Sequence, residues 1–177
     1  MTKSITVYNK EELDVYKENI VNNLEESVKQ IEKIIREKES LEVFKDFKFE
    51  KIAREPLSGK RENLIEVINQ SQTYLISILA VEYLFDKYPE QVFVLNWGNI
   101  PGYDIESVDG TIIAECFAAT SYKSNGKLTA DLKRLNANNT ACIKYEFFYD
   151  KEFKEEQKQL YKEKYPTVTI VKFSKMF

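Results

Sequence analysis

The chain has 177 residues, a formal net charge of -3 and a sequence pI near 5.3. A chain of this length forms one domain with its own buried core, and its charge does not predict tight non-specific binding to nucleic acid. It contains no histidine, which excludes Ser-His-Asp triads, Cys-His pairs and histidine-ligated metal sites. Any catalysis must therefore use carboxylates, lysines, tyrosines or a metal ion held by oxygen atoms.

The sequence predicts a cytoplasmic protein without a membrane partner. No run of apolar residues is long enough to span a bilayer, and the first residues lack the apolar core of a signal peptide. Cys116 and Cys142 fall in predicted inner strands, where a free cysteine behaves as a small apolar side chain. We therefore expect free thiols and no structural disulfide.

Apolar side chains between Leu13 and Ile35 recur at spacings of three and four residues, which predicts one long amphipathic helix over residues 10–38. Two interpretations of its apolar face stay open: the helix lies on the core, or it contacts a partner. Residues 41–52 contain three phenylalanines and are predicted to form a short strand or a helix end that packs these rings inward. Residues 55–59 form a connection.

The remaining chain alternates between helices and strands. We expect a helix over residues 60–87, a strand over 91–97, a hairpin over 102–120, a helix over 127–136, a strand over 140–149, a helix over 151–164 and a strand over 167–173. This order predicts a three-layer α/β/α architecture with a central mixed sheet, in which three strands form a meander and crossover helices add parallel neighbours. The whole chain, 1–177, is predicted as a single domain, with a helical extension over 1–59 and a core over 60–177.

The hairpin carries acidic side chains on its two strands. Asp109-Gly110 predicts a two-residue type I′ turn with positive φ at both residues, and counting outward from this turn sets Asp104 opposite Glu115. Like charges about 5 Å apart repel each other, and a divalent cation would cancel the repulsion. Carboxylates suit Mg²⁺ or Mn²⁺, which keep positions for water and phosphate oxygens and can activate a water molecule. In the alternative interpretation, the two acids lie exposed on a polar sheet face.

The motifs Pro101-Gly102-Tyr103-Asp104 and Ala114-Glu115-Cys116-Phe117 resemble those of the PD-(D/E)XK nuclease superfamily. The resemblance implies a restriction-endonuclease-like core of a helix, a three-stranded meander, a helix and a strand. It also implies that Asp104 and Glu115 bind the metal ion. The family's lysine, two residues after the glutamate, is replaced here by Phe117.

The resemblance implies that another element supplies the missing cation. Lys127, in the first turn of the helix that follows the hairpin, is the favoured substitute, and Lys123 and Lys144 are the alternatives. Some members of the family also direct a glutamate from the first core helix into the site. Glu66 is the preferred match for this additional metal ligand, ahead of Glu62.

The leading hypothesis is a metal-dependent endonuclease of the restriction type that hydrolyses phosphodiester bonds of DNA as a homodimer. Lys123, Lys127, Lys133 and Arg134 would contact DNA phosphates, or are ordinary surface charges. An alternative is a catalytically inactive protein of the same fold that binds nucleic acid or a protein partner. A third hypothesis is an unrelated α/β interaction protein.

Overall fold

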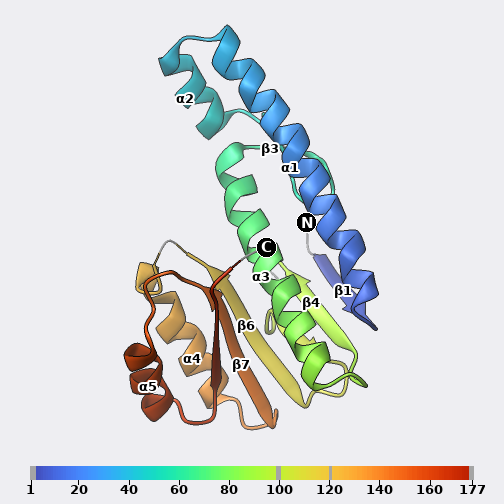
Figure 1. Cartoon of the computed structure of the whole chain (residues 1–177), viewed down its shortest axis with the longest axis vertical. Helices are drawn as coiled ribbons and strands as arrows, with labels where there is room; N and C mark the ends of the chain where they lie inside the picture. The colour runs from blue at the N-terminus through green and yellow to red at the C-terminus, as the bar shows by residue number, and fades with distance from the viewer. Residues whose placement is uncertain (1–2, 99–100, 120, 176–177) are drawn as a thin grey trace. The chain divides into compact units, whose positions relative to one another are not determined.

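The computed structural model describes residues 3–98, 101–119 and 121–175, and the chain divides into two compact units. One unit contains residues 1–10 and 73–177, and the other contains residues 11–72. Figure 1 shows the elements of both units, coloured along the chain. The boundary that the sequence predicts after residue 59 stays a prediction.

A mixed sheet of six strands, in the order β1-β4-β5-β6-β7-β8, forms the centre of the first unit as far as its residues are described. Neighbouring strands are antiparallel from β1 to β6, whereas β6-β7 and β7-β8 are parallel. The predicted mixed sheet is therefore confirmed. The strands are β1 (Lys3–Val7), β4 (Phe93–Trp97), β5 (Ile105–Ser107), β6 (Ile112–Ala118), β7 (Ile143–Tyr149) and β8 (Thr169–Phe173).

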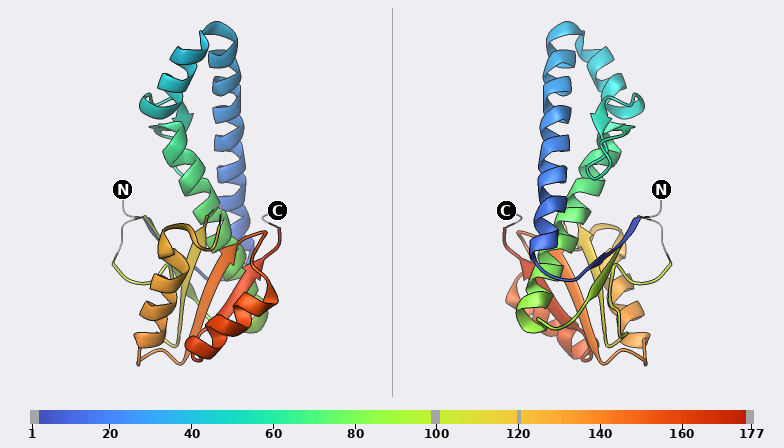
Figure 2. Two further views of the ribbon diagram at one scale, coloured as in Figure 1. Left: turned by 90° about the vertical axis from the view of Figure 1, so that its left-hand side faces the viewer. Right: turned by 90° about the vertical axis from the view of Figure 1, so that its right-hand side faces the viewer.

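Helices cover both faces of this sheet (Figure 2). On one face, the part of α3 (Leu64–Lys87) that belongs to this unit brings the ring of Tyr74 to 5.0 Å from that of Trp97, measured between centroids. On the other face, a short turn η1 (Ser124–Gly126) leads into α4 (Lys127–Ala137), and α5 (Glu155–Lys164) follows β7. The chain is thus an α/β protein, in agreement with the three predicted layers. The core beneath α4 includes Ile113, Phe117, Leu128, Leu132, Leu135, Phe148 and Ile170.

Helix α3 corrects the expectation that no segment could span a bilayer. Among the described residues, it is the one helix that is long and apolar enough to cross a membrane by length and composition. Half of its most apolar stretch is buried inside the protein, and Phe85, near its end, packs edge-on against Phe93 of the sheet at 5.1 Å. Burial against the sheet accounts for this composition, as it does for the core helix of a soluble protein.

The register of the hairpin agrees with the prediction. Ile105 pairs with Ala114, and Glu106 pairs with Ile113. These are the partners obtained by counting outward from the turn. The register matters for the site because side chains alternate between the two faces of a strand, so it decides which acids of β5 and β6 lie beneath α4.

The turn itself is not the predicted type I′ turn. The N–H of Gly110 donates to the C=O of Ser107 at 2.8 Å, and Gly110 has a φ of 72°, whereas Asp109 does not have a positive φ. The Asp109 carboxylate accepts hydrogen bonds from the Ser107 hydroxyl and from the N–H of Thr111. These bonds hold the turn with a single left-handed residue, and they also hold the pKa of Asp109 well below its usual value.

Strand β1 has no counterpart among the predicted elements. It pairs antiparallel with β4 over its whole length, from Lys3 opposite Trp97 to Val7 opposite Phe93. Val7 is fully buried, and the Ser4 hydroxyl donates to the side chain of Asn96 at 2.8 Å. Strand β1 therefore forms one edge of the sheet, next to β4.

The cysteines differ in their surroundings. Cys116 is buried in β6, as predicted, whereas Cys142 is exposed and lies before β7 rather than within it. The prediction of an inner strand is thus wrong for Cys142, because β7 begins one residue later. Both thiols are free, as expected.

The unit of residues 11–72 is mainly helical. It contains α1 (Glu11–Glu37), which confirms the long predicted helix, α2 (Ser40–Phe49), a hairpin of β2 (Ala53–Arg54) and β3 (Arg61–Glu62), and the first part of α3. Ile34, Val43 and Ile52 form its buried cluster. Phe44 and Phe49 are 74% and 67% exposed. Inward packing is therefore wrong for two of the three phenylalanines.

Candidate active site

Asp104 lies directly before β5, and its side chain reaches β6. Its carboxylate Oδ2 accepts a hydrogen bond from the backbone N–H of Cys116 at 2.8 Å, and its backbone C=O accepts one from the N–H of Asn96 at 2.8 Å. Because β5 begins at Ile105, Asp104 is not a ladder partner of Glu115. The carboxylate of Asp104 instead binds the residue that follows Glu115.

Glu115 and Glu146 are neighbours in the parallel part of the sheet. They are paired in the register of β6 and β7, so their side chains point to the same face, and they are 1% and 0% exposed. The next pair on that face is Phe117 and Phe148, whose rings stack with centroids 5.1 Å apart. Two acids are therefore buried in the sheet face that α4 covers. Phe117, two residues after Glu115, is a core residue.

Helix α4 directs three charged side chains toward these acids. Lys127, Asp131 and Arg134 are spaced by four and three residues, which sets them on one side of the helix. Lys127 Nζ lies 2.7 Å from Asp131 Oδ2. Arg134 forms an ion pair with Glu115, and its guanidinium lies 4.8 Å from the centroid of the Tyr103 ring. The buried acids of the sheet thus face two cations and a further acid.

Burial dominates the electrostatics of the sheet acids. It raises the pKa of Asp104, although the hydrogen bond from Cys116 and the charges of Lys127 and Arg134 oppose the rise. Burial also raises the pKa of Glu146 well above its usual value, and the negative charges of Asp131 and Asp104 add to it. Repulsion between carboxylates in a site that excludes water produces shifts in this direction, and such shifts are common at functional sites.

Lys127 and Asp131 form a coupled pair at the edge of this site. Burial alone would lower the pKa of Lys127, but the hydrogen bond to Asp131 and the charges of Asp104 and Glu146 outweigh it, so the pKa is raised. Burial raises the pKa of Asp131 despite its bond to Lys127. Lys127 therefore carries its positive charge within the electrostatic reach of three carboxylates.

The side chains provide donors for a hard cation without forming a closed cage around one. Within the described ranges, no group of three or more Asp, Glu or Cys side chains is arranged to hold a metal ion. The donor chemistry fits Mg²⁺ or Mn²⁺, because the candidate ligands Asp104, Glu115 and Glu146 all offer carboxylate oxygens. Both carboxylate oxygens of Glu146 are buried without a hydrogen-bond partner among the described residues. Such a group is costly, and a cation or a proton would reduce the cost.

The structure brings together Asp104, Glu115, Lys127 and Arg134 of the predicted site. Glu66 lies on α3 within the other unit, where it is exposed, and its role as a metal ligand stays a prediction. The remaining predicted lysines lie elsewhere. Lys123 is exposed, with its Nζ 5.5 Å from the centroid of the Tyr122 ring, and Lys133 is exposed on α4. Lys144 is buried and donates a hydrogen bond to the C=O of Asn138.

Glu146 and Asp131 belong to the site but were not among its predicted residues. The alternation of Lys144, Glu146 and Phe148 in β7 would have indicated a charged residue on the face that Phe148 buries. The spacing of Lys127 and Asp131 is that of an ion pair on one helix. Neither pattern is specific until the parallel register of β6 and β7 is known.

Comparisons with protein-family models, curated proteins and solved structures find no match to this chain.

Proposed function

We propose that this protein is a metal-dependent endonuclease of the PD-(D/E)XK type that hydrolyses phosphodiester bonds of DNA. The observation that carries the proposal is the order α3, β4-β5-β6, α4, β7, in which the meander is antiparallel and β7 is parallel to β6. This order supports the restriction-endonuclease-like core that the resemblance implies. In such a fold, Asp104 and Glu115 would take the positions of the family's two acids.

Asp104 and Glu115 would hold Mg²⁺ or Mn²⁺, with the unpartnered carboxylate of Glu146 as a further donor. When bound, such an ion activates water and neutralises the charge that develops on phosphorus. Arg134 would have to leave Glu115 to free that carboxylate. Its side chain is 49% exposed, so it can turn toward solvent and toward a phosphate without unfolding the helix.

Lys127 supplies the charge that Phe117 cannot. Because its pKa is raised, Lys127 stays protonated at neutral pH and acts as a hydrogen-bond donor, not as a base. A protonated lysine beside Asp104 would orient the attacking water or stabilise a phosphate oxygen. Asp131 holds the ammonium group at 2.7 Å and thereby keeps the side chain on the side of α4 that faces the sheet.

The proposal predicts cleavage that depends on a divalent metal. Supercoiled plasmid and single-stranded DNA are incubated with the full chain in Mg²⁺, in Mn²⁺ and with excess chelator, and the products are separated by electrophoresis. We expect nicked or linear products with metal and intact DNA with chelator. Cleavage that persists in the presence of chelator would contradict the proposed mechanism.

A second candidate function is the inactive binding protein of the same fold. The ion pair of Arg134 with Glu115 favours it, because that pair occupies one metal ligand, and so does the burial of Phe117. A calorimetric titration with Mn²⁺ separates the two functions. Binding at up to millimolar metal favours the nuclease, and no heat of binding over that range favours the inactive protein.

We expect Lys127→Met to lower the cleavage rate by about 100-fold, the loss typical for removing one donor that stabilises developing charge. Lys127→Arg should restore part of the rate because it keeps the charge. Lys162→Met is the matched control: this lysine is exposed on α5 and should leave the rate unchanged. A rate for Lys127→Met close to that of the control would exclude Lys127 from the mechanism.

A further inference from the structure

Arg134 is paired with a side chain that the proposed metal site needs. Its guanidinium group forms an ion pair with Glu115, one of the two acids of that site. The side chain of Glu115 is 1% exposed, whereas that of Arg134 is 49% exposed. The pair thus joins a buried anion to a cation at the surface. A divalent ion that binds Glu115 competes with Arg134 for the charge of this carboxylate.

Arg134 also acts on the other carboxylates of the site. Burial raises the pKa of Asp104 and of Glu146, and the positive charge of Arg134 opposes the rise for both carboxyls. Glu146 is the partner of Glu115 in the register of β6 and β7. One guanidinium group therefore partly neutralises all three proposed ligands, and it supplies part of the positive charge that a metal ion would bring.

The ring of Tyr103 gives Arg134 a contact that does not involve Glu115. The central carbon of the guanidinium group lies 4.8 Å from the centroid of this ring, within the range of a cation–π contact. Asn138 holds the ring by donating a hydrogen bond to its hydroxyl at 3.2 Å. The backbone N–H of Tyr103 donates to Glu106 Oε1 at 2.9 Å. The ring is held by bonds that do not require Arg134 to stay on Glu115.

We propose that Arg134 couples the binding of metal and of DNA at this site. With neither bound, its guanidinium group pairs with Glu115. With both bound, Glu115 holds the metal ion and the guanidinium group binds a phosphate of the DNA backbone. The planar donors of a guanidinium group match the oxygens of a carboxylate and of a phosphate alike. The inference rests on the proposed function, which supplies both the metal ion at Glu115 and the phosphodiester.

The coupling follows from the shared ion pair. Metal binding alone separates Arg134 from Glu115 and leaves the guanidinium group without an anionic partner. DNA alone gains this group only by leaving Glu115 buried and unpaired, which is costly. When both bind, each half of the broken pair has a new partner. Each ligand therefore raises the affinity for the other, and by the same factor.

Calorimetric titration with Mn²⁺, without DNA, tests whether the metal competes with Arg134. We expect Arg134→Met to bind Mn²⁺ at least about fivefold more tightly than the natural chain, because the metal no longer has to displace a cation. Circular dichroism checks that the variant keeps its helix content. If Arg134→Met does not fold, Arg134→Gln takes its place, since glutamine can still donate a hydrogen bond to Glu115 but carries no charge.

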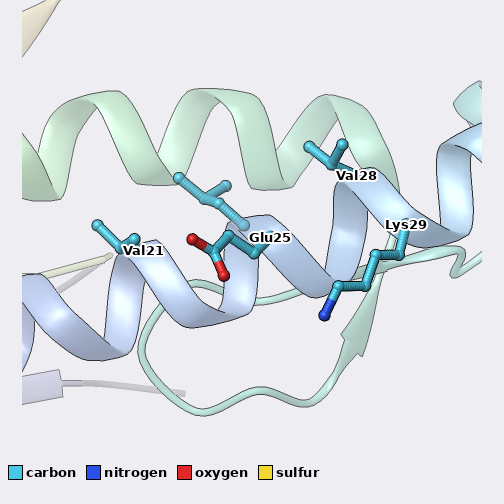
Figure 3. A pocket seen from close by; sticks show the side chains of 5 residues that line it. Val21, Glu25, Val28 and Lys29 are labelled. Atoms are coloured by element: carbon cyan, nitrogen blue, oxygen red, sulfur yellow. The ribbon is translucent and has the colours of Figure 1, made fainter.

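Helix α1 provides the matched control. Arg36 pairs with Glu32 there and is 78% exposed, so Arg36→Met removes the same charge from another arginine–glutamate pair. The groove of about 390 Å³ on the same helix has a single carboxylate in its lining, that of Glu25 (Figure 3). Isolated carboxylates bind a divalent ion weakly. Arg36→Met should therefore have the Kd of the natural chain for Mn²⁺.

The outcomes separate the coupling from the metal site. Equal Kd values for the Arg134 variant and the natural chain, with Mn²⁺ bound by both, would overturn the coupling and leave the proposed metal site intact. A lack of Mn²⁺ binding by all the proteins would overturn the proposed function, and the coupling with it.

A DNA-binding assay tests whether Arg134 moves to a phosphate. Fluorescence anisotropy at constant ionic strength measures the affinity of the Lys127→Met chain, which should cleave slowly, for labelled single-stranded DNA with Mn²⁺ and with excess chelator. We expect Mn²⁺ to raise this affinity at least about fivefold more in Lys127→Met than in a chain that carries Arg134→Met as well. An equal effect of Mn²⁺ on both chains would show that Arg134 does not couple the two ligands.

Discussion

Asp104→Asn is expected to reduce metal-dependent DNA cleavage by at least about 100-fold. Asparagine has nearly the volume of aspartate and keeps an oxygen that can accept the hydrogen bond from the N–H of Cys116, which is 2.8 Å from Asp104 Oδ2. It lacks the negative charge that binds a divalent cation. The substitution therefore separates metal binding from the structural role of this side chain. The cleavage rate at saturating Mg²⁺, and the affinity for Mn²⁺ measured by calorimetry, are both expected to fall.

The stability of Asp104→Asn serves as the control for folding. Burial raises the pKa of Asp104, so the ionised carboxylate is unfavourable in the folded state at neutral pH. The free energy of unfolding of the variant should consequently equal or exceed that of the natural chain. Glu90→Gln is the matched control for charge. Glu90 is exposed, so the Glu90→Gln protein should cleave DNA at the rate of the natural chain. Cleavage by Asp104→Asn within a few-fold of this control would exclude Asp104 from the mechanism.

The hairpin shows which parts of the fold follow from local sequence. Its register follows from the position of the Asp109-Gly110 turn, which is visible within a few residues. The long helix α1 is predictable for the same reason, since its periodic pattern extends over many turns. The predicted turn type was wrong because the conformation of the turn depends on the hydrogen bonds that the Asp109 carboxylate accepts. The Asp-Gly pair alone does not specify these bonds.

Features that depend on contacts distant in the chain were not predictable. The pairing of β1 with β4 joins segments about ninety residues apart, as in the contact of Ser4 with Asn96, and a five-residue strand at the start of a chain has a weak pattern of its own. The approach of Glu146 to Glu115 depends on the crossover through α4. A crossover fixes the direction of a parallel strand, but not its register. For this reason the sequence indicated Asp104 and Glu115 and missed Glu146, the acid that β7 adds to the site.

The buried carboxyl of Glu146 makes the stability of the protein dependent on pH. Burial and the nearby acids raise its pKa well above the ordinary value of 4.5, so the folded state binds this proton more tightly than the unfolded state. The resulting contribution to stability is fully present below about pH 4.5 and is lost as the pH rises through the raised pKa. Glutamine at this position has similar size and no ionisation.

We therefore expect Glu146→Gln to raise the free energy of unfolding by about 1 to 3 kcal/mol near pH 8 and by much less near pH 5. Urea unfolding followed by circular dichroism at both pH values measures the difference. Millimolar Mg²⁺ should stabilise the natural chain more than the variant. A bound cation would neutralise the Glu146 carboxylate, whereas the glutamine of the variant carries no charge to neutralise. A variant that is less stable at both pH values would show that the Glu146 carboxyl has a structural partner instead. Equal stabilisation of both proteins by Mg²⁺ would remove Glu146 from the metal site and leave Asp104 and Glu115 as its only proposed ligands in the sheet unit.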